Sequence, residues 1–424
     1  MRLEHVPVGC AILVIDVGLI PELHFDLPFP VAAARGLRPR PRLRRRPPRD
    51  IWSERKTRCH SLPLAPNIPE REAEPRYIPR SGCARRHDPD ICKCRQAGKS
   101  PEPAGCCMKP EILILGAPPP PLLARLGDAV RAHVLTEGDI DARAAGRIAG
   151  LVSSSARPVD AALLEQLPAL RVISKLGVGY DNIDVAAARA RGIAVAHTRD
   201  VLNADVANFA LTLLLAASRG LVCEDAYVRR GDWGRAPMPP LRWSIEGETI
   251  GIVGLGRIGR TLAAKLSAFG CEVLYHGRRP QPDQPYEYCP DLVAMARRCR
   301  ALILILPGGP ESAGLVTAQV IDALGPEGLL VNVARGEVVD QEALIAALRE
   351  GRLGQAALDV FADEPHVPQA LRDLPNVILT PHVASATRET RLAMFNLCAD
   401  NILAFFREGA CLTPVPESAP APQT

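Results

Sequence analysis

The segment TIGIVGLGRIGR, from Thr249 to Arg260, constrains the fold of this chain more than any other stretch of its sequence. It joins a short apolar run to a helical pattern through Gly254, Gly256 and Gly259, which have the spacing G-x-G-x-x-G. The first glycine permits a tight turn, the second lets backbone approach a pyrophosphate, and the third lets the helix pack on the strand. The N-terminus of that helix then faces the anion. A glycine-rich turn without a ligand is the alternative, but the flanking strand and helix favour a dinucleotide-binding domain.

The next apolar run, CEVLYH, ends where such a domain usually carries an acid, about twenty residues past the glycines. That acid would accept a hydrogen bond from the ribose 2′-hydroxyl of NAD. The sequence has no acid there and reads His276, Gly277, Arg278 and Arg279. Guanidinium groups suit the charge and geometry of the 2′-phosphate of NADP. We therefore predict that NADPH is preferred and that NADH is possible, with two solvated arginines as the alternative.

Strands and helices alternate from about residue 108 onward, which predicts parallel sheets with crossover helices. The predicted strands of a first series are EILILG, AGLVSS, LRVISKLG and GIAVAH, and those of a second series are ETIGIVGLG, CEVLYH, ALILILP, GLLVNVAR, QAALDVF and NVILTPH. A long helix over 203–220 joins the two series, and a last helix over 386–409 returns to the first. The predicted fold is therefore α/β, with two doubly wound parallel-sheet lobes, Rossmann-like or flavodoxin-like, and the cofactor lobe inserted into the substrate lobe.

We expect a substrate-binding domain at 108–206 and 390–416, an NAD(P)-binding domain at 207–389, and a tail at 417–424. Residues 1–107 differ in composition, because they hold 16 of the 41 prolines, 7 of the 13 cysteines, and 20 Lys and Arg against 12 Asp and Glu. An Arg/Pro run such as RGLRPRPRLRRRPPRD cannot form a helix or a ladder strand. We expect this extension to be disordered or not part of the native protein, with Met108 as the natural start. A basic arm that binds nucleic acid is the less favoured alternative.

Hydropathy and cysteine spacing favour neither a membrane-spanning protein nor a metal-binding one. No apolar run reaches eighteen residues, so we expect no transmembrane helix. The six cysteines after Met108 are scattered, as is typical of free thiols in the cytoplasm. The cysteines of the extension do not have the spacing of a zinc knuckle, so we predict no metal site.

Three polar residues follow successive predicted strands of the second series: Arg335, Glu364 and His382. In open α/β sheets the ligand crevice lies beyond the carboxyl ends of the strands. His382 can supply a proton near neutral pH, and Glu364 beside it would fix its tautomer and raise its pKa. Arg335 can bind a carboxylate and polarise a neighbouring carbonyl. Each residue alone is more often an ordinary surface group, but their joint placement indicates reduction of a 2-keto acid.

Residues 108 to about 416 resemble the D-isomer-specific 2-hydroxyacid dehydrogenases, and especially the glyoxylate/hydroxypyruvate reductase branch. The resemblance is carried by KLGVGYDNID, GIVGLGRIGR, NVARGEVVD, ALDVFADEP and TPHVASAT. It implies that Arg335, Glu364 and His382 are catalytic and that Asp359 helps to place the nicotinamide. By the same resemblance, Arg335 and the backbone around Leu176, Val178 and Gly179 would hold the substrate carboxylate. Further contacts with the cofactor are expected from Arg257, Ile258, Pro307 and Ala334. The resemblance also implies a homodimer.

The function predicted from the sequence is NADPH-dependent reduction of a small 2-keto acid, with glyoxylate and hydroxypyruvate as the substrates expected. One alternative is an NAD-dependent dehydrogenase of another 2-hydroxyacid, of the hydroxyphenylpyruvate or phosphoglycerate type. Another is a nucleotide-sensing binding protein like the corepressors that share this fold, because a fold alone does not determine function.

Overall fold

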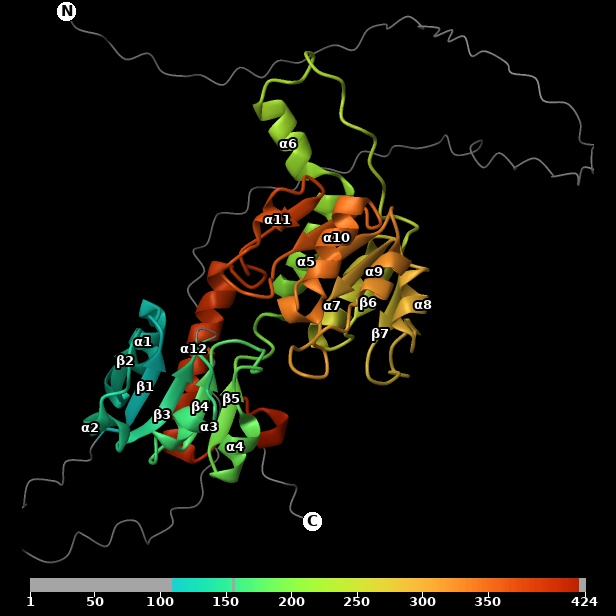
Figure 1. Cartoon of the computed structure of the whole chain (residues 1–424). Coiled ribbons are helices and arrows are strands. Elements are labelled where there is room, and N and C mark those ends of the chain that lie inside the picture. Colours follow the sequence, from blue (N-terminus) through green and yellow to red (C-terminus); the bar gives the residue numbers. More distant parts are fainter. Residues whose placement is uncertain (1–108, 155–156, 419–424) are drawn as a thin grey trace, which may run out of the picture. The chain divides into compact units, whose positions relative to one another are not determined.

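The computed structural model describes residues 109–154 and 157–418 of the 424-residue chain (Figure 1). The predictions made for residues 1–107, for Met108 as a start and for the last residues of the tail lie outside these ranges.

The first sheet is fully parallel, with the strand order β2-β1-β3-β4-β5. This is the flavodoxin-like order, in which the chain starts inside the sheet and winds outward in both directions. The strands are β1 (Glu111–Leu115), β2 (Arg131–Leu135), β3 (Ile148–Ser153), β4 (Val172–Lys175) and β5 (Ala194–His197). Four short helices connect them: α1 (Pro120–Leu126), α2 (Ala142–Ala145), α3 (Ala161–Glu165) and α4 (Val185–Ala190), with the 3-10 turn η2 (Gly127–Ala129) after α1.

The second sheet is also fully parallel, with the order β12-β11-β10-β9-β6-β7-β8. Its strands are β6 (Thr249–Val253), β7 (Glu272–His276), β8 (Glu287–Tyr288), β9 (Ala301–Leu304), β10 (Leu329–Asn332), β11 (Gln355–Leu358) and β12 (Val377–Leu379). The strand order reverses between β6 and β9, which is the switch point where a Rossmann sheet opens its ligand crevice. Its helices are α7 (Arg257–Ala268), α8 (Leu292–Ala296), α9 (Ala318–Leu324), α10 (Gln341–Glu350) and α11 (Gln369–Arg372), with the 3-10 turn η3 (Gly336–Val338) after β10.

Each sheet is covered by helices on both faces, because alternate residues of a strand point to opposite sides. In β9, Ala301 and Ile303 belong to the core beneath α5 and α7, while Leu302 and Leu304 belong to the core beneath α8, α9 and α10. The first sheet is divided in the same way, with α3 and α4 over one face and α1 and α12 over the other. This double burial explains why the strands are continuous apolar runs in the sequence.

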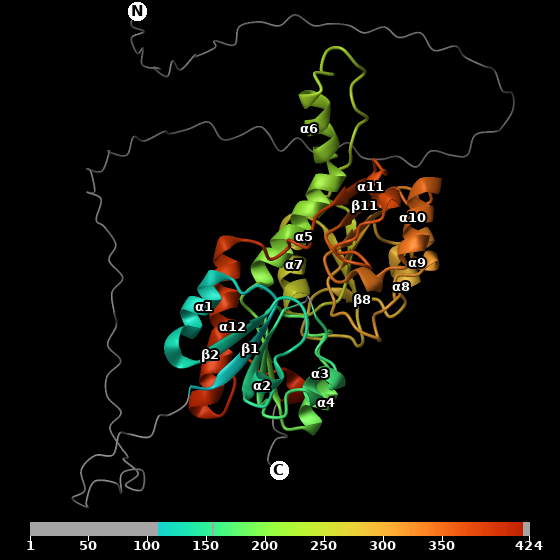
Figure 2. The same cartoon turned by 60° about the vertical axis from the view of Figure 1, so that its left-hand side comes forward.

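Two long helices carry the chain from the first sheet to the second and back. Helix α5 (Asn203–Ser218) packs against α7 and the strands β10 to β12, and α6 (Leu221–Arg229) follows it. Helix α12 (Arg388–Glu408) returns to the first sheet and lies along α1 and β4 in both views (Figure 1 and Figure 2). There Ser174 Oγ donates to the carbonyl of Cys398 at 2.9 Å, beside the fully buried Ile402. The 3-10 turn η4 (Pro416–Ser418) ends the described chain. The predicted α/β fold, with the second lobe inserted into the first, is therefore confirmed.

Within the described ranges, no single helix is long and apolar enough to cross a membrane. Helices α5 and α6 reach the length and apolar content of a membrane span only when they are taken together, and the chain bends by 59° between them.

Candidate active site

The three glycines after β6 serve different purposes. Gly254 has a φ of +104°, and a Cβ on it would lie 2.8 Å from the carbonyl oxygen of Ile305. A Cβ on Gly259 would lie 2.2 Å from the carbonyl oxygen of Gly254, so this glycine lets α7 approach the loop. A Cβ on Gly256 would meet nothing within 4 Å, although Gly256 is the N-cap of α7 and has no side chain to cap it. Open space at an uncapped helix N-terminus is what a pyrophosphate requires, so these residues fit a dinucleotide.

The loop after β7 is held at both ends. The Tyr288 hydroxyl donates to the carbonyl of Gly277 at 3.1 Å, and the backbone N–H of Gln281 donates to the Tyr275 hydroxyl at 2.7 Å. Gln281 Nε2 also donates to the carbonyl of Leu255 at 2.9 Å, which ties this loop to the glycine loop. The strand end is fixed as well, because His276 Nδ1 lies 2.9 Å from the carbonyl oxygen of Cys289. The backbone that carries Arg278 and Arg279 is therefore anchored to the phosphate-binding loop.

Both predicted phosphate-binding arginines have exposed side chains. Arg278 pairs with Glu311 at 3.4 Å, and the two side chains are 88% and 81% exposed. Exposed pairs of this kind contribute about 0–1 kcal/mol, so a phosphate can replace Glu311 at little cost. The residues directly after β7 include no carboxylate that would accept a hydrogen bond from a ribose hydroxyl.

The residues predicted to be catalytic follow three neighbouring parallel strands. Arg335 follows β10, Glu364 follows β11 and His382 follows β12, and these strands are adjacent in the sheet. His382 Nδ1 lies 2.8 Å from Glu364 Oε2. Glu364 also accepts the backbone N–H of Phe361 at 3.1 Å through Oε1. The predicted pairing of His382 with Glu364 is therefore present.

The Glu364 carboxyl group is held in its charged form. Burial raises its pKa, but the hydrogen bond and charge of His382 outweigh burial, and the pKa of Glu364 lies below its ordinary value. A carboxylate only accepts hydrogen bonds, so Nδ1 of His382 carries a hydrogen and Nε2 is the atom left for chemistry.

Asp359 organises the turn that carries His382. It is fully buried, and its carboxylate accepts the Thr380 hydroxyl at 2.7 Å and the backbone N–H groups of Val383 and Ala384, both at 2.9 Å. His382 has a φ of +53°, a left-handed conformation that is uncommon for residues other than glycine. The Asp359 bonds on either side stabilise this turn. The expected contact of Asp359 with the nicotinamide stays a prediction.

The predicted substrate loop follows β4 in the first sheet and is bonded to the end of β5. The backbone N–H of Gly177 donates to Thr198 Oγ1 at 3.0 Å, and His197 Nδ1 lies 2.8 Å from the carbonyl oxygen of Val178. Leu176, predicted to line the substrate, is partly buried against the neighbouring cores. The amides of this loop are thus fixed by side chains of another strand.

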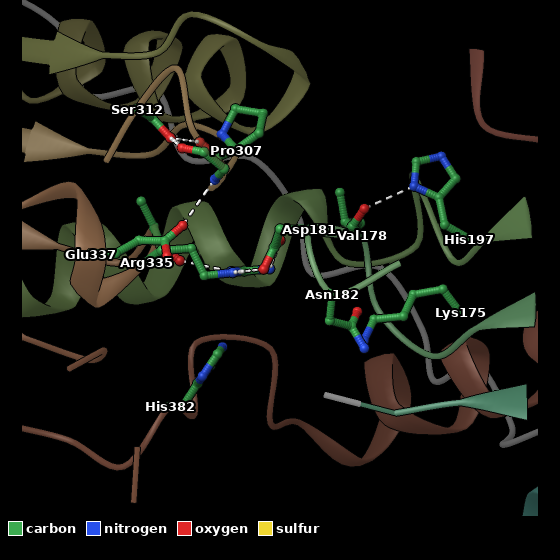
Figure 3. A network of polar contacts seen from close by, with 12 residues as sticks. Lys175, Val178, Asp181, Asn182, His197, Pro307, Ser312, Arg335, Glu337 and His382 are labelled. Atoms are coloured by element: carbon green, nitrogen blue, oxygen red, sulfur yellow. Dashed lines mark hydrogen bonds and ion pairs between the residues drawn. The ribbon is translucent and has the colours of Figure 1, made fainter. Parts of the chain in front are cut away.

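Arg335 and the substrate loop are in contact. A Cβ on Gly179 would lie only 1.8 Å from Arg335 Nη2, so the guanidinium packs directly against this glycine. Arg335 also forms an ion pair with Asp181 of the same loop, with Nη2 to Oδ1 at 3.1 Å and Nε to Oδ2 at 3.3 Å (Figure 3). The structure therefore brings the predicted Arg335 and Gly179 together, from different sheets.

The other predicted cofactor residues lie at the same edge of the second sheet. Pro307 follows β9 and accepts the Ser312 hydroxyl at 2.8 Å, and Ala334 follows β10, its N–H bonded to Asn332 Oδ1 at 3.0 Å. Arg257 and Ile258 open α7, and Arg257 pairs with Asp200 at 3.1 Å.

Comparisons with known proteins agree with this geometry. Residues 211–384 match the family described as D-isomer specific 2-hydroxyacid dehydrogenase, NAD binding domain. A 2-ketogluconate reductase from Gluconobacter oxydans is 42% identical over 307 residues, covering 72% of this chain and 99% of its own. This chain belongs to the D-isomer specific 2-hydroxyacid dehydrogenases. The predicted family is confirmed, and with it the prediction of an NAD(P)-dependent enzyme.

Two further relatives share this family. Glyoxylate/hydroxypyruvate reductase A of Arabidopsis thaliana is 44% identical over 268 residues, covering 63% of this chain and 85% of its own. The crystal structure of the NADPH-dependent glyoxylate/hydroxypyruvate reductase of Sinorhizobium meliloti, in complex with NADP and malonate, is 42% identical with a TM-score of 0.70. It covers 73% of this chain and 98% of its own.

Sequence reasoning missed two charged residues of this dehydrogenase, Asp181 and Lys175. Lys175 ends β4, is 2% exposed, and donates from Nζ to the carbonyl of Ser154 at 2.8 Å. Burial lowers the pKa of Lys175 to about 8, although Asp181 raises it. The sequence does contain one feature that could have identified Lys175, because it is a lone lysine at the end of an apolar strand, directly before the substrate loop.

Substitution of Gly179 by alanine should impair substrate binding without unfolding the dehydrogenase. The new Cβ displaces the Arg335 guanidinium, which is the free end of a flexible side chain, so the melting temperature should change little. The KM for the 2-keto acid should rise about tenfold or more, since small displacements of binding groups cost that much. Gly146→Ala, where a Cβ meets nothing within 4 Å, is the matched control. An unchanged KM in Gly179→Ala would contradict the contact.

The burial of Lys175 predicts a pH dependence of stability. Its pKa falls from 10.5 in a free lysine to about 8 in the folded protein. Between these values the unfolded chain binds a proton that the folded protein does not, so stability rises with pH across this window. Relative to Lys175→Met, the wild-type free energy of unfolding should gain up to about 3 kcal/mol from pH 8 to pH 10.5. Denaturant titrations of both proteins measure this, and a constant difference would contradict the assignment.

Proposed function

We propose that this dehydrogenase reduces a small 2-keto acid, glyoxylate or hydroxypyruvate, to the D-2-hydroxy acid with NADPH. The observation that carries the proposal is the pair of His382 and Glu364, whose Nδ1 and Oε2 atoms lie 2.8 Å apart. The pair lies at the same edge of the sheet as Arg335, and Arg335 packs against Gly179 of the substrate loop. A proton donor and a carboxylate-binding cation at the same edge of the sheet are the groups that this reduction requires.

Arg335 and the loop around Val178 and Gly179 hold the substrate in this mechanism. The guanidinium donates charge-assisted hydrogen bonds to the substrate carboxylate and polarises the adjacent carbonyl. The backbone N–H groups of the loop add neutral donors that are already oriented, because Thr198 and His197 fix the loop. Little further ordering is then needed when the substrate binds.

His382 supplies the proton. As the proton donor, His382 needs a hydrogen on Nε2 as well as on Nδ1, where it faces the Glu364 carboxylate at 2.8 Å. Bound NADPH supplies the hydride for the carbonyl carbon. The Nε2 proton of His382 passes to the carbonyl oxygen, which becomes the hydroxyl, and a neutral imidazole with its hydrogen on Nδ1 remains. The side chain is 43% exposed, so solvent can return the proton.

Arg278 and Arg279 would bind the 2′-phosphate of NADPH. The loop that carries both arginines is bonded to the glycine loop, and the carboxylate that pairs with Arg278, Glu311, is exposed and can be displaced by a phosphate. The relative from Sinorhizobium meliloti, 42% identical, is described as NADPH-dependent, which supports the same preference here.

Initial rates with glyoxylate or hydroxypyruvate and either NADPH or NADH test the function. We expect turnover with both acids and a kcat/KM that favours NADPH, since only NADPH carries a 2′-phosphate for the two arginines to bind. Measured in the same way, 2-ketogluconate and hydroxyphenylpyruvate are the comparison substrates. Higher kcat/KM values for either of these, or for NADH, would overturn the corresponding part of the proposal.

The double variant Arg278→Ala, Arg279→Ala provides the control for the cofactor preference. It should raise the KM for NADPH at least tenfold, as expected for the loss of charge-assisted bonds, and leave the KM for NADH nearly unchanged. Equal effects on both cofactors would show that these arginines do not bind the 2′-phosphate.

We also propose that the enzyme acts as a cytoplasmic homodimer. Helix α6 and the segment after it expose large apolar side chains, namely Leu221, Val222, Val228, Trp233, Met238 and Leu241. Apolar clusters of this kind on a folded protein mark interaction surfaces. All six cysteines of the described ranges are free thiols, which suits a reducing compartment. A monomeric mass in solution, or disulfides at these cysteines in protein taken from cells, would contradict this proposal.

A further inference from the structure

Asp181 links the substrate loop of the first sheet to Arg335 of the second. Its two carboxylate oxygens accept from Nη2 and Nε of Arg335 at 3.1 and 3.3 Å. The two side chains are only 28% and 27% exposed, so water screens the pair less than it screens the exposed ion pairs of this protein. Figure 3 shows the two side chains meeting end to end, while His382 approaches from a separate loop.

The pair fixes the orientation of the guanidinium. Nη1 of Arg335 donates to its neighbour's carbonyl, Ala334 O, at 2.7 Å, and Nη2 packs against Gly179. Asp181 occupies one edge of the group, through Nε and Nη2. Of the five N–H donors of an arginine, one on Nη1 and one on Nη2 then have no acceptor among the described residues, and such a pair can bind a carboxylate bidentately.

The space around the pair is shaped by a second glycine. A Cβ on Gly308 would lie 2.7 Å from Arg335 Cγ, 2.9 Å from Glu337 Oε1 and 3.4 Å from Asp181 Cγ, so a larger residue here would require side chains around the pair to shift. The carboxylate is charged: burial raises the pKa of Asp181, but the charge and hydrogen bond of Arg335, helped by Lys175, lower it below its ordinary value. Asp181 is therefore a permanent anionic partner of Arg335.

We propose that Asp181 is a positioning residue for the reduction: it holds one edge of the Arg335 guanidinium so that the other edge faces the substrate carboxylate. This inference rests on the proposed function, in which Arg335 binds that carboxylate. Asp181 could have two other roles, and each predicts a different result. If Asp181 only linked the two loops, its loss would affect stability alone. If its carboxylate competed with the substrate for Arg335, its loss would strengthen substrate binding.

Asp181→Asn tests the proposal, because it keeps the shape of the side chain and removes its charge. We expect the KM for glyoxylate to rise about tenfold or more, with the KM for NADPH changed less than about twofold, since charge-assisted bonds are roughly twice as strong as neutral ones. Asp184→Asn is the matched control. Asp184 lies three residues further along the same loop and caps α4 through the N–H of Ala187 at 2.8 Å. This control should leave both the melting temperature and the KM for glyoxylate nearly unchanged, because asparagine caps a helix about as well as aspartate.

A double-mutant cycle separates positioning from a structural effect. If Asp181 acts through Arg335, Asp181→Asn should change the KM for glyoxylate less than about twofold in an Arg335→Lys background. Should Arg335→Lys turn over too slowly, binding of oxamate to the NADPH-bound protein by calorimetry gives the same comparison. Equal effects in both backgrounds would overturn the proposal in favour of a structural role.

Three other results would also overturn the proposal. A lower KM for glyoxylate in Asp181→Asn would identify Asp181 as a competitor of the substrate. An unchanged KM in Asp181→Asn, with normal turnover by the wild-type protein, would remove the positioning role and leave the proposed function standing. No turnover of glyoxylate or hydroxypyruvate by the wild type would overturn the proposed function, and this inference with it.

Discussion

Each strand of both sheets runs parallel to its neighbours, and this constraint places every candidate functional residue of the protein. A parallel strand must be followed by a crossover, so the loops after neighbouring strands leave from the same edge of the sheet. Gly256, Arg278, Arg335, Glu364 and His382 come from five such loops of the second sheet. They are spread over more than a hundred residues of sequence, and they lie at the same edge of the sheet because its strands are parallel.

A loop of the first sheet contacts this edge of the second sheet, and glycine makes the contact possible. Arg335 packs where a side chain on Gly179 would stand, and its ion pair with Asp181 joins residues 154 positions apart. Around this contact the charges are paired or bonded: Asp181 with Arg335, Glu364 with His382, and Lys175 with the carbonyl of Ser154. Paired charges tolerate partial burial, and a partly buried cation attracts an anionic substrate more strongly than an exposed one.

Much of this arrangement could be predicted from the sequence, because its signals are local. The spacing of Gly254, Gly256 and Gly259, the apolar strands and the polar residues that follow them all lie within short segments. Two strands were missed for a physical reason. Strand β2 is an edge strand whose side chains are mostly exposed, and β8 has only two residues, so neither has a continuous apolar run. The side-chain partnerships of Asp181, Lys175 and His197 were missed because each partner comes from another loop or strand, and only the folded sheet brings them together.

The most direct test of the account is the turnover and cofactor binding of His382→Ala. If His382 donates the proton, kcat for glyoxylate should fall by about 10²- to 10⁴-fold, while the dissociation constant of NADPH stays nearly the same. His366→Ala is the matched control, because His366 is 79% exposed and pairs with Asp363 rather than with Glu364, so it should keep wild-type rates. A His382→Ala enzyme that keeps its kcat, or that loses NADPH binding instead, would contradict the assignment on which the proposed mechanism rests.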